Sequence, residues 1–416
     1  MLERIEKIFT IAMLFYATTA ILPFILGDTG DAAQGDGDPI AFTIQAALYL
    51  LAFCFIALHW RTVIRGAWNA KWILLLILVA VASTGWSQQP LFTLRRSAVM
   101  AATTAFGIYF GSRYTVPEQL HLLGWTCALT VFTSFFMALF LPQYGVDHFL
   151  FPGAWRGAFW HKNLLARNMV LSVLVFHFLR KSVPNWIRWL GIGVSLCLLA
   201  LSRSVTGPLV LAAIILVVLM TKLLRQRFTF SIPILIASSL IATCAAFVLA
   251  GAMGDVLGFL GRNSTLTGRT YVWKAVLHSI AKHPWLGYGF DAFWTNLPGG
   301  SSSLIQEMGW APGHAHNGFL ALTLEMGIVG LGILLAGYLV LWRRALSLTR
   351  KGMGVVPIWL CAYLSFMLFY NLDEGPILAQ NNIFWILYTS TAVAVSLYAS
   401  APFSSQVVNL GRPEKA

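Results

Sequence analysis

The sequence predicts an all-α, polytopic integral membrane protein with about twelve transmembrane helices. Three observations lead to this fold class. Hydrophobic residues make up 58% of the 416 residues and charged residues only 10%, whereas soluble domains carry about 25% charged residues. Apolar runs of about 20 residues recur along the chain, and each is long enough to cross roughly 30 Å of hydrocarbon. The loops between these runs alternate between basic and acidic character.

The apolar runs place the expected spans in order. The first, residues 8–26, follows a short charged segment and is not followed by a convincing cleavage site, so we expect an uncleaved span rather than a signal peptide. The others are expected at 40–58, 71–86, 97–111, 120–141, 165–179, 187–201, 205–221, 231–250, 316–341, 356–370 and 383–400. One long segment, 251–315, separates the ninth span from the tenth. No soluble domain is expected, so residues 1–416 form one membrane-embedded domain.

The basic residues orient the spans, because Lys and Arg favour cytoplasmic loops. With the N-terminus inside, most of the 28 basic residues fall in inside loops, and most acidic residues fall outside. We therefore expect both termini on the cytoplasmic side and the segments 142–164 and 251–315 on the outer side. The net charge of +13 follows from this topology and does not indicate a nucleic-acid partner.

Some basic residues break this pattern and lie in outer segments. Cations placed against the trend favour an anionic ligand at the outer surface. They are Arg95, Arg96, Arg156, Lys162, Arg167, Arg203, Arg262, Arg269, Lys274 and Lys282.

The long outer segment predicts a helix from about Thr267, as N-cap, to about Lys282. Arg269 lies in its first turn, and His283-Pro284 ends it. We expect the helix to lie on the membrane surface; an interfacial helix with snorkelling basic residues is the alternative to a ligand site. Its apolar face is expected to consist of Val272, Trp273, Val276, Leu277 and Ile280.

A histidine pair, His314 and His316, stands where the tenth span is expected to begin. The dipole at a helix N-terminus disfavours imidazolium, and a neutral imidazole can act as a general base. At about 100° per residue, Gly327 and Gly330 share the face of His316, where another helix can approach closely, whereas Glu325 points away. The alternatives are that the pair only caps the span, or that it binds a metal, for which no third ligand is evident.

Three further outer segments combine cations with aromatic residues or lie close to hydrocarbon. Arg203 occupies a short turn between two apolar runs, where a charge is costly and functional by default. The segment 86–97 contains Arg95 and Arg96. The segment 153–163 contains Arg156, His161, Lys162 and Asn163. Aromatic faces pack on sugar rings and basic side chains pair with phosphate, although an ordinary interfacial aromatic belt is the alternative.

No cofactor and no metal are expected. The cysteines all fall inside apolar runs without metal-ligand spacing. Asp36-Gly37-Asp38 lies in a Gly-rich loop with no nearby His, which favours a solvated loop over a metal site. The chain contains neither a P-loop nor a dinucleotide fingerprint, so ATP or nucleotide-sugar use is not indicated.

These residues together resemble the signature of the O-antigen ligase/polymerase superfamily. The ligase pattern is His, then Asn, Ser or Gln, nine residues, Gly, two residues and Gly, and the chain matches it at His316, Asn317, Gly327 and Gly330. Arg269, Trp273 and the segment Lys282-His283-Pro284-Trp285-Leu286-Gly287-Tyr288-Gly289 precede it in the same order. The segments Trp86-Ser87 with Leu94-Arg95-Arg96, and Trp155-Arg156-Gly157 with His161-Lys162-Asn163, resemble the exopolysaccharide polymerase (ExoQ-like) branch.

The resemblance implies an inverting, metal-independent glycosyltransferase of the bacterial inner membrane whose site faces the periplasm. It implies a donor glycan on undecaprenyl pyrophosphate, held by Arg203 and Arg269, and a general base at His316 that activates the acceptor hydroxyl. Other polysaccharide-export proteins are further expected partners. Further expected substrate-binding residues are Arg95, Arg96, Arg156, His161, Lys162, Asn163, His314 and Asn317.

Three functions stay open at this point. A polymerase would use the terminal sugar of another lipid-linked repeat as acceptor, and an O-antigen ligase would use a lipid A–core sugar. A flippase for lipid-linked oligosaccharides would not be an enzyme. Transporters tend to bind at the bilayer midplane near internal repeats, whereas the polar residues here gather at one face, which favours an enzyme.

Overall fold

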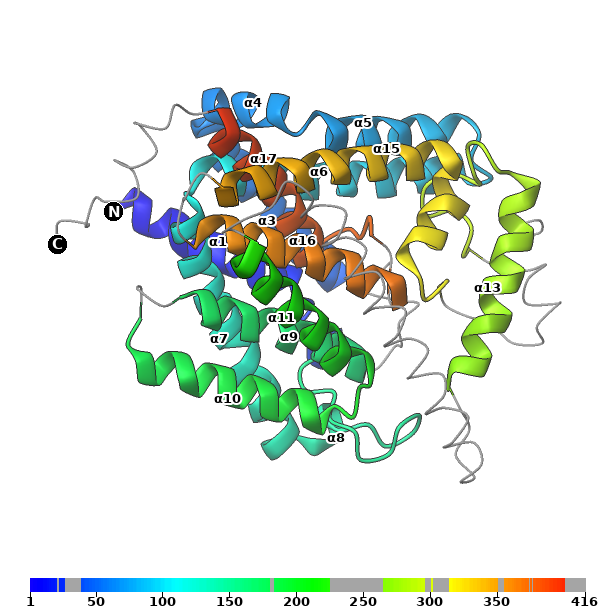
Figure 1. The fold of residues 1–416 in the computed structure, drawn as a ribbon. Helices are drawn as coiled ribbons and strands as arrows, with labels where there is room; N and C mark the ends of the chain where they lie inside the picture. Colours follow the sequence, from blue (N-terminus) through cyan, green and yellow to red (C-terminus); the bar gives the residue numbers. More distant parts are fainter. Residues whose placement is uncertain are drawn as a thin grey trace.

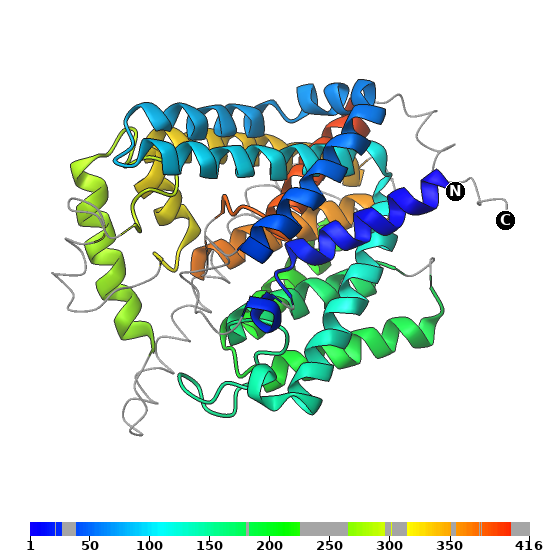
Figure 2. The same cartoon turned by 180° about the vertical axis from the view of Figure 1, so that it is seen from behind.

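The computed structural model describes residues 1–20, 22–26, 39–179, 183–224, 265–295, 301, 314–350, 355–373, 375 and 377–400. Within these residues the regular elements are helices, and strand pairing is limited to one isolated bridge between Val146 and Trp155. The described part of the chain is therefore all-α, as the sequence predicts. Figures 1 and 2 show long helices packed side by side, with α13 set across one end of the bundle.

The expected spans fall on helices, except 231–250, which lies outside the described residues. The helices are α1 (Leu2–Ala17), α2 (Leu22–Leu26), α3 (Pro39–Leu58), α4 (Trp60–Asn69), α5 (Lys71–Ala82), α6 (Pro90–Arg113), α7 (Val116–Phe140), α8 (Pro142–Gly145), α9 (Lys162–Phe178), α10 (Asn185–Leu201), α11 (Thr206–Leu224), α13 (Thr265–Lys282), α15 (Gly318–Arg350), α16 (Val356–Asp373) and α17 (Ile383–Ser400). The expected first span corresponds to α1 and α2 together, and the 3-10 turn Ser83–Gly85 follows α5.

The length and composition of these helices are those of a membrane protein. Among the described residues, three helices (α3, α7 and α15) are long and apolar enough to span a bilayer alone, and α4 with α5, bent by 89°, can form a fourth span. Shorter apolar helices include α10, α11, α16 and α17. Large apolar side chains such as Phe53, Phe132 and Leu139 are exposed on the outer surface of the bundle, as expected where lipid is the solvent. The number of about twelve spans stays a prediction.

Helix α4 was not expected from the apolar pattern. It connects α3 to α5 and mixes basic and aromatic residues, with Trp60 and Trp68 exposed and Val63 and Gly66 buried. Such a composition is typical of a helix at a membrane interface. A search for apolar runs therefore passes over it.

Helices α6 and α17 meet through small residues. A Cβ at Gly107 would lie 2.8 Å from Cβ of Thr389, and a Cβ at Gly111 would lie 2.8 Å from Cα of Ser390. Small side chains let two helix backbones approach closely, which is the usual way in which membrane helices gain packing contacts.

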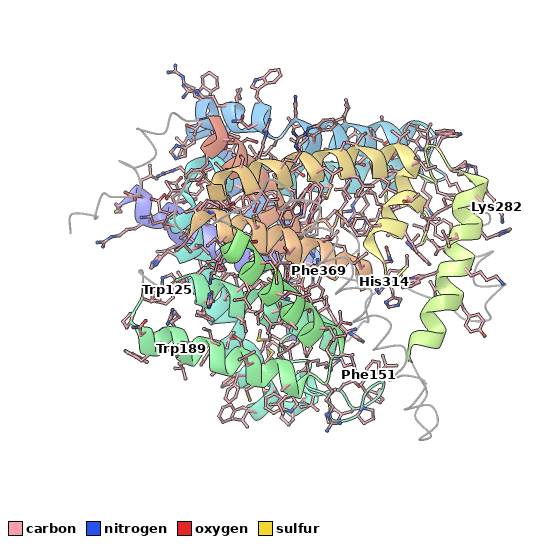
Figure 3. All side chains as sticks on the ribbon, viewed as in Figure 1. Trp125, Phe151, Trp189, Lys282, His314 and Phe369 are labelled. Carbon is pink, nitrogen blue, oxygen red and sulfur yellow. The ribbon has the colours of Figure 1, made fainter. Side chains whose placement is uncertain are left out.

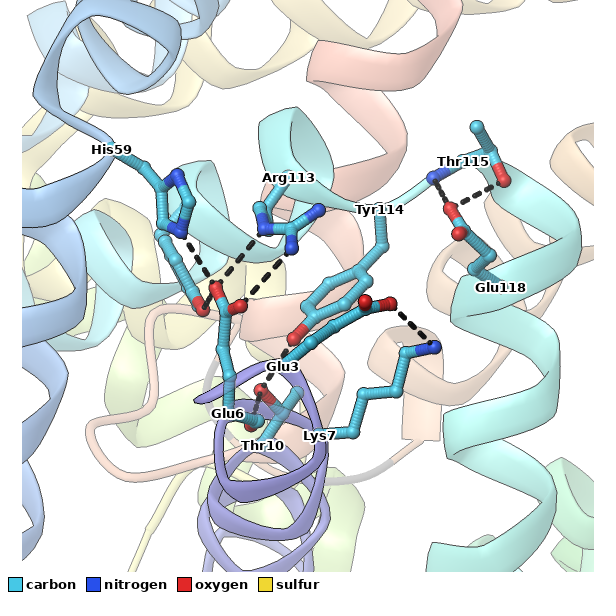
Figure 4. Close-up of polar contacts among 10 residues, drawn as sticks. Glu3, Glu6, Lys7, Thr10, His59, Arg113, Tyr114, Thr115 and Glu118 are labelled. Atoms are coloured by element: carbon cyan, nitrogen blue, oxygen red, sulfur yellow. Dashed lines mark hydrogen bonds and ion pairs between the residues drawn. The ribbon is translucent and has the colours of Figure 1, made fainter. Parts of the chain in front are cut away.

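A polar cluster closes the bundle at the end that holds the N-terminus (Figure 4). The Glu6 carboxylate, 3% exposed, accepts hydrogen bonds from Tyr109 Oη at 2.6 Å and from Arg113 Nε and a terminal nitrogen at 3.0 Å each. His59 Nε2 lies 2.9 Å from the same carboxylate. Burial alone would raise the pKa of Glu6, but these hydrogen bonds and the charges of Arg113 and His59 outweigh it and hold the pKa below its ordinary value.

The segments expected outside meet at the opposite end. Trp86 Nε1 donates to the Leu286 carbonyl at 3.1 Å, and the Trp155 N–H donates to the Leu201 carbonyl at 3.0 Å. Figure 3 shows Phe151, Lys282 and His314 toward this end, with Trp125 and Trp189 toward the other. The loops that the charge pattern assigns to one side of the membrane thus lie at one end of the bundle in the structure. Which side of the membrane each end faces stays a prediction.

Candidate active site

Helix α13 lies across the ends of α5, α6 and α15 rather than along them (Figure 1). It starts at Thr265, two residues before the expected N-cap, and ends at Lys282 as expected. Val272 and Val276 are buried in a small cluster with Ala321 and Leu324 of α15. Leu277 is 54% exposed and lies outside this cluster. The placement across the bundle end suits a helix at a membrane surface.

Position 269 lies within α13, four residues before Trp273. Residues four apart share one face of a helix, so position 269 and Trp273 are on the same side of α13. The Trp273 Nε1 donates to the Ala315 carbonyl at 3.0 Å. The side chain of Arg269, and all of Arg262, Asp36 and Asp38, lie outside the described residues.

Helix α15 is broken at Gly327, which has φ 65° and ψ −170°. A side chain there would face both a left-handed backbone conformation and a collision with the Trp285 carbonyl group. The backbone groups that the break releases pair with the Pro284–Gly289 segment. These hydrogen bonds run from Tyr288 N to Leu324 O (3.0 Å), Gly289 N to Glu325 O (2.9 Å), Ile328 N to Pro284 O (2.8 Å) and Val329 N to Trp285 O (3.3 Å).

This break overturns the expectation that His316 shares a helix face with Gly327 and Gly330. His316 precedes the helix and has φ 49°, outside the helical region. Asn317 is the cap instead, since its Oδ1 accepts the N–H groups of Phe319 and Leu320, each at 3.0 Å. Gly327 does allow a close approach, as predicted, but by an irregular segment, and a Cβ at Gly330 would meet Met326 of its own helix.

The turn that carries His316 is held from two sides. The Trp273 indole of α13 binds the Ala315 carbonyl, and Asn317 Nδ2 donates to the Leu372 carbonyl at the end of α16, 2.9 Å away. His314, labelled in Figure 3, lies with its ring centroid 3.9 Å from that of His316 and its plane tilted by 43°. The direction of His314, which the sequence left undetermined, is thus toward His316. We call residues 314–317 the His316 turn.

A second turn, residues 202–205, carries Arg203 and is called the Arg203 turn. Arg203 has φ 51°, and its exposed guanidinium donates to the Pro152 carbonyl at 3.3 Å. Lys162 Nζ lies 3.5 Å from the Arg203 carbonyl oxygen, and the Ser204 hydroxyl donates to Asn163 Oδ1 at 3.0 Å. The structure therefore brings together Lys162, Asn163 and Arg203, three of the residues that the sequence singled out.

Other predicted residues have structural partners of their own. His161 Nδ1 accepts the Asn163 N–H at 3.2 Å and so caps α9. Arg156 Nε donates to the Tyr144 carbonyl at 2.9 Å, which fixes the loop before α9. The Asp147 carboxylate in that loop accepts the backbone N–H groups of Phe149 and Phe151. Burial would raise the pKa of Asp147, but these hydrogen bonds and the charge of Arg156 lower it below its ordinary value.

Arg96 pairs with an acidic residue that the sequence analysis did not single out. Its Nε lies 3.2 Å from Asp291 Oδ2, and Gln380 Nε2 donates to the same oxygen at 3.2 Å. Because Asp291 matches its charge, Arg96 is a weak candidate for binding an anionic substrate. Neither Asp291 nor Gln380 carries a local sequence signal, since the pairing joins segments far apart in the chain.

The arrangement as a whole places Arg203, position 269 of α13 and His316 toward one end of the bundle. Among the described residues, no three His, Cys, Asp or Glu side chains are grouped to hold a metal ion. The chemistry available there is proton transfer by His316 and charge stabilisation by Arg203.

Residues 190–335 match the family model described as O-antigen ligase. This segment contains both the Arg203 turn and the His316 turn, together with α13 and the broken part of α15. This match and the relatives below support the resemblance to the O-antigen ligase/polymerase superfamily. The match to the family model therefore covers the parts from which the candidate site is built.

The chain is similar to the exopolysaccharide production protein ExoQ of Rhizobium meliloti. The two are 26% identical over 348 residues, which cover 79% of this chain and 78% of the relative. A putative polysaccharide ligase of Rickettsia conorii is 28% identical over 120 residues, 27% of this chain and 29% of that protein. Another, from Rickettsia prowazekii, is 33% identical over 81 residues, 18% of this chain and 20% of that protein.

Proposed function

We propose that this chain is an inverting, metal-independent membrane glycosyltransferase that uses glycans linked to undecaprenyl pyrophosphate and joins repeat units into a surface polysaccharide. The observation that carries the proposal is the hydrogen bond from Trp273 to the Ala315 carbonyl. It ties the helix face that holds position 269 to the turn that holds His316. The Arg203 turn lies at the same end of the bundle, so a donor, an acceptor and a base can meet there.

The reaction follows from the chemistry of these residues. The acceptor hydroxyl gives its proton to His316 as its oxygen bonds to the anomeric carbon of the donor sugar. The bond from that carbon to the pyrophosphate oxygen breaks, and its electron pair leaves with the pyrophosphate. Arg203 and Arg269 hold the pyrophosphate and stabilise its growing negative charge. Attack opposite the leaving group inverts the anomeric configuration.

Polymerisation is the first candidate because the exopolysaccharide production protein resembles this chain over most of both lengths. The acceptor would then be the terminal sugar of another lipid-linked repeat. Ligation to lipid A–core is the second candidate, favoured by the description of the matching family model and by the two putative polysaccharide ligases. The proposed reaction is the same in both, and only the acceptor differs.

A product assay with the purified protein in nanodiscs tests the proposal. The protein is supplied with a lipid-linked repeat unit as donor, and either a second repeat or lipid A–core as acceptor, with and without EDTA. New glycosidic bonds between repeats, insensitive to EDTA and absent with His316→Ala, are the expected result. Bonds to lipid A–core alone would select the ligase. Movement of the lipid-linked repeat across the bilayer with no new bond would contradict the proposal and favour a flippase.

A further inference from the structure

The two turns of the proposed site rest on different parts of the bundle. The Arg203 turn connects α10 to α11 and is tied to the start of α9. The His316 turn is tied to α13 and to the end of α16. Transfer needs the imidazole and the donor pyrophosphate at a fixed separation, because a small displacement of reacting groups lowers the rate steeply. A side chain or helix that contacts the supports of both turns must therefore fix the distance between them.

Arg167 of α9 lies among the elements that connect them. It is only 5% exposed. Its guanidinium carbon is 3.9 Å from the ring centroid of Phe384 in α17 and 5.5 Å from that of Tyr370 in α16. A buried arginine in a membrane protein is costly and marks a functional element by default. The sequence analysis counted Arg167 only as one of the outer cations.

The neighbours of Arg167 reach the His316 turn through the segment after α16. A Cβ at Gly375 would lie 3.3 Å from a terminal nitrogen of Arg167. The carbonyl oxygen of Gly375 lies 2.9 Å from the Cβ position of Gly318, the first residue of α15. Asn317 donates to the Leu372 carbonyl in the same stretch. The guanidinium thus packs against the segment on which the His316 turn is seated.

The other side of the same contact leads to the Arg203 turn. Gly207, which follows the turn at the start of α11, has its Cβ position 3.6 Å from Tyr370 Oη. The same position lies 3.1 Å from Cβ of Ala166, the neighbour of Arg167 in α9. Arg167 and Tyr370 therefore join the end of α16 to both turns.

We propose that Arg167 is a positioning residue that sets the separation of the Arg203 turn and the His316 turn. Its planar guanidinium stacks on Phe384 and spans to Gly375, which a lysine cannot reproduce because its charge is a point on a flexible stem. The inference rests on the proposed function for its catalytic consequence. Its structural consequence, the fixed separation, does not depend on any activity.

Kinetics of the full-length protein test the catalytic part. Arg167→Lys and Arg167→Met are expected to lower kcat by about 10²-fold with the donor KM unchanged, since each turn stays intact while their separation is lost. Arg188→Lys is the matched control, because Arg188 is 6% exposed and lies over the Trp189 ring at 4.9 Å, but at the start of α10. It should keep the wild-type kcat. Wild-type kcat in Arg167→Lys, or an equal loss in Arg188→Lys, would overturn the inference.

A distance measurement tests the structural part without substrate. Spin labels at Val205 and at Lys274, both exposed, report the separation of the Arg203 turn from α13, in a background whose native cysteines are replaced. In folded protein, Arg167→Met should broaden the distance distribution and Arg188→Lys should leave it narrow. A narrow distribution in Arg167→Met would reject positioning, even if kcat fell. If Arg167→Met broadened the distance distribution while the wild-type protein showed no transferase activity, the proposed function would be rejected and the positioning role of Arg167 would stand.

Discussion

His316 lies one residue before the cap of α15, in a turn whose carbonyl and side-chain contacts come from α13 and α16. These contacts fix the imidazole on a rigid support although it is not part of the helix. Because the turn is held by Trp273 and Asn317 rather than by His316 itself, removing the imidazole should leave the turn in place. Substitution at this position is therefore a clean test of the base.

We expect His316→Ala to lower transfer by about 10² to 10⁴-fold, the usual loss on removing a general base. Donor binding should persist, because the arginines remain. His314→Ala should lose much less, since His314 packs beside the imidazole but is not assigned the proton. Turnover and donor affinity of the purified proteins measure both effects. Near-normal turnover in His316→Ala would rule out His316 as the general base. Equal losses in both variants would leave its assignment over His314 unsupported.

The Arg203 guanidinium is exposed, and its hydrogen bond to the Pro152 carbonyl orients it. Replacing it with lysine keeps the charge but loses the planar pair of donors that fits a phosphate, so Arg203→Lys should rescue poorly. Arg203→Gln should lose on the order of 10² to 10³-fold in kcat. Arg61→Lys, an exposed arginine over the Trp60 ring in α4, is the control. Full activity of Arg203→Lys in the product assay would show that bidentate contact is unnecessary.

Glu6 is a residue whose charge supports the fold rather than the reaction. Because its pKa is depressed, the stability that it contributes is present above the ordinary glutamate pKa of 4.5 and is lost as pH falls through the folded-state value. At pH 7, Glu6→Gln should lower stability by roughly 3 kcal/mol, since it removes one partner of a buried ion pair. Thermal unfolding at pH 7 and pH 4 measures this, and the gap to wild type should shrink at pH 4.

Glu3→Gln is the control for that experiment. Glu3 pairs with Lys7 at 3.0 Å on the surface of α1, where ion pairs contribute little, so its Tm should stay near that of wild type. A Glu6→Gln protein as stable as Glu3→Gln would show that the cluster in Figure 4 does not hold the helices together.

At the scale of elements, apolar runs predict helices well and breaks poorly. The runs located α9, α10 and α16 within a few residues because each is a long, nearly continuous apolar run. The break in α15 was not predicted, because the residues around Gly327 are apolar and a glycine is tolerated in a membrane helix. Only the hydrogen bonds to the Pro284–Gly289 segment, from far along the chain, stabilise the break.

In the candidate site, too, local sequence patterns were predictive and tertiary contacts were not. The spacing of His316, Asn317, Gly327 and Gly330 marked a region that the family model also covers. The helical geometry assumed for it was wrong, since φ at His316 and Gly327 is positive. Outer cations were found by their violation of the charge pattern. The pairing of Arg96 with Asp291 could not be found in this way, because it is a tertiary contact with no local signal.

The break of α15 at Gly327 leads to a testable prediction. Gly327→Ala places a Cβ against the Trp285 carbonyl at a φ that disfavours side chains, so we expect the break to shift, the Pro284–Gly289 contacts to weaken and transfer to fall. Gly332→Ala, five residues on in the same helix, meets nothing within 4 Å and should be neutral or stabilise by up to about 1 kcal/mol. Thermal unfolding and the product assay measure both variants. Equal Tm and activity in the two would mean that the break is not required.

At the scale of the whole molecule, each end of the bundle carries polar residues, and the two ends differ in which charged side chains they hold. One end holds Glu6 with Arg113 and His59. The other holds the Arg203 turn, the His316 turn, α13 and, among the described outer cations, Lys162 and Lys282. A lipid-linked pyrophosphate substrate would have to reach the second end from the bilayer, and its glycan would extend away from it. The function therefore depends on which compartment this end faces.

We expect the end with the Arg203 and His316 turns to face the periplasm, because most basic residues then lie inside. Cysteines at Leu150 and at Trp68, both exposed and at opposite ends, are to be labelled with a membrane-impermeant maleimide, after replacement of the native cysteines. In cells with a permeabilised outer membrane, Leu150→Cys should react, while Trp68→Cys should react only after lysis. A periplasmic reporter fused near Ser302 should be active. Labelling of Trp68→Cys alone, with a reporter at Ser302 active only in the cytoplasm, would invert the topology and remove the site from the compartment in which the proposed donor and acceptor meet.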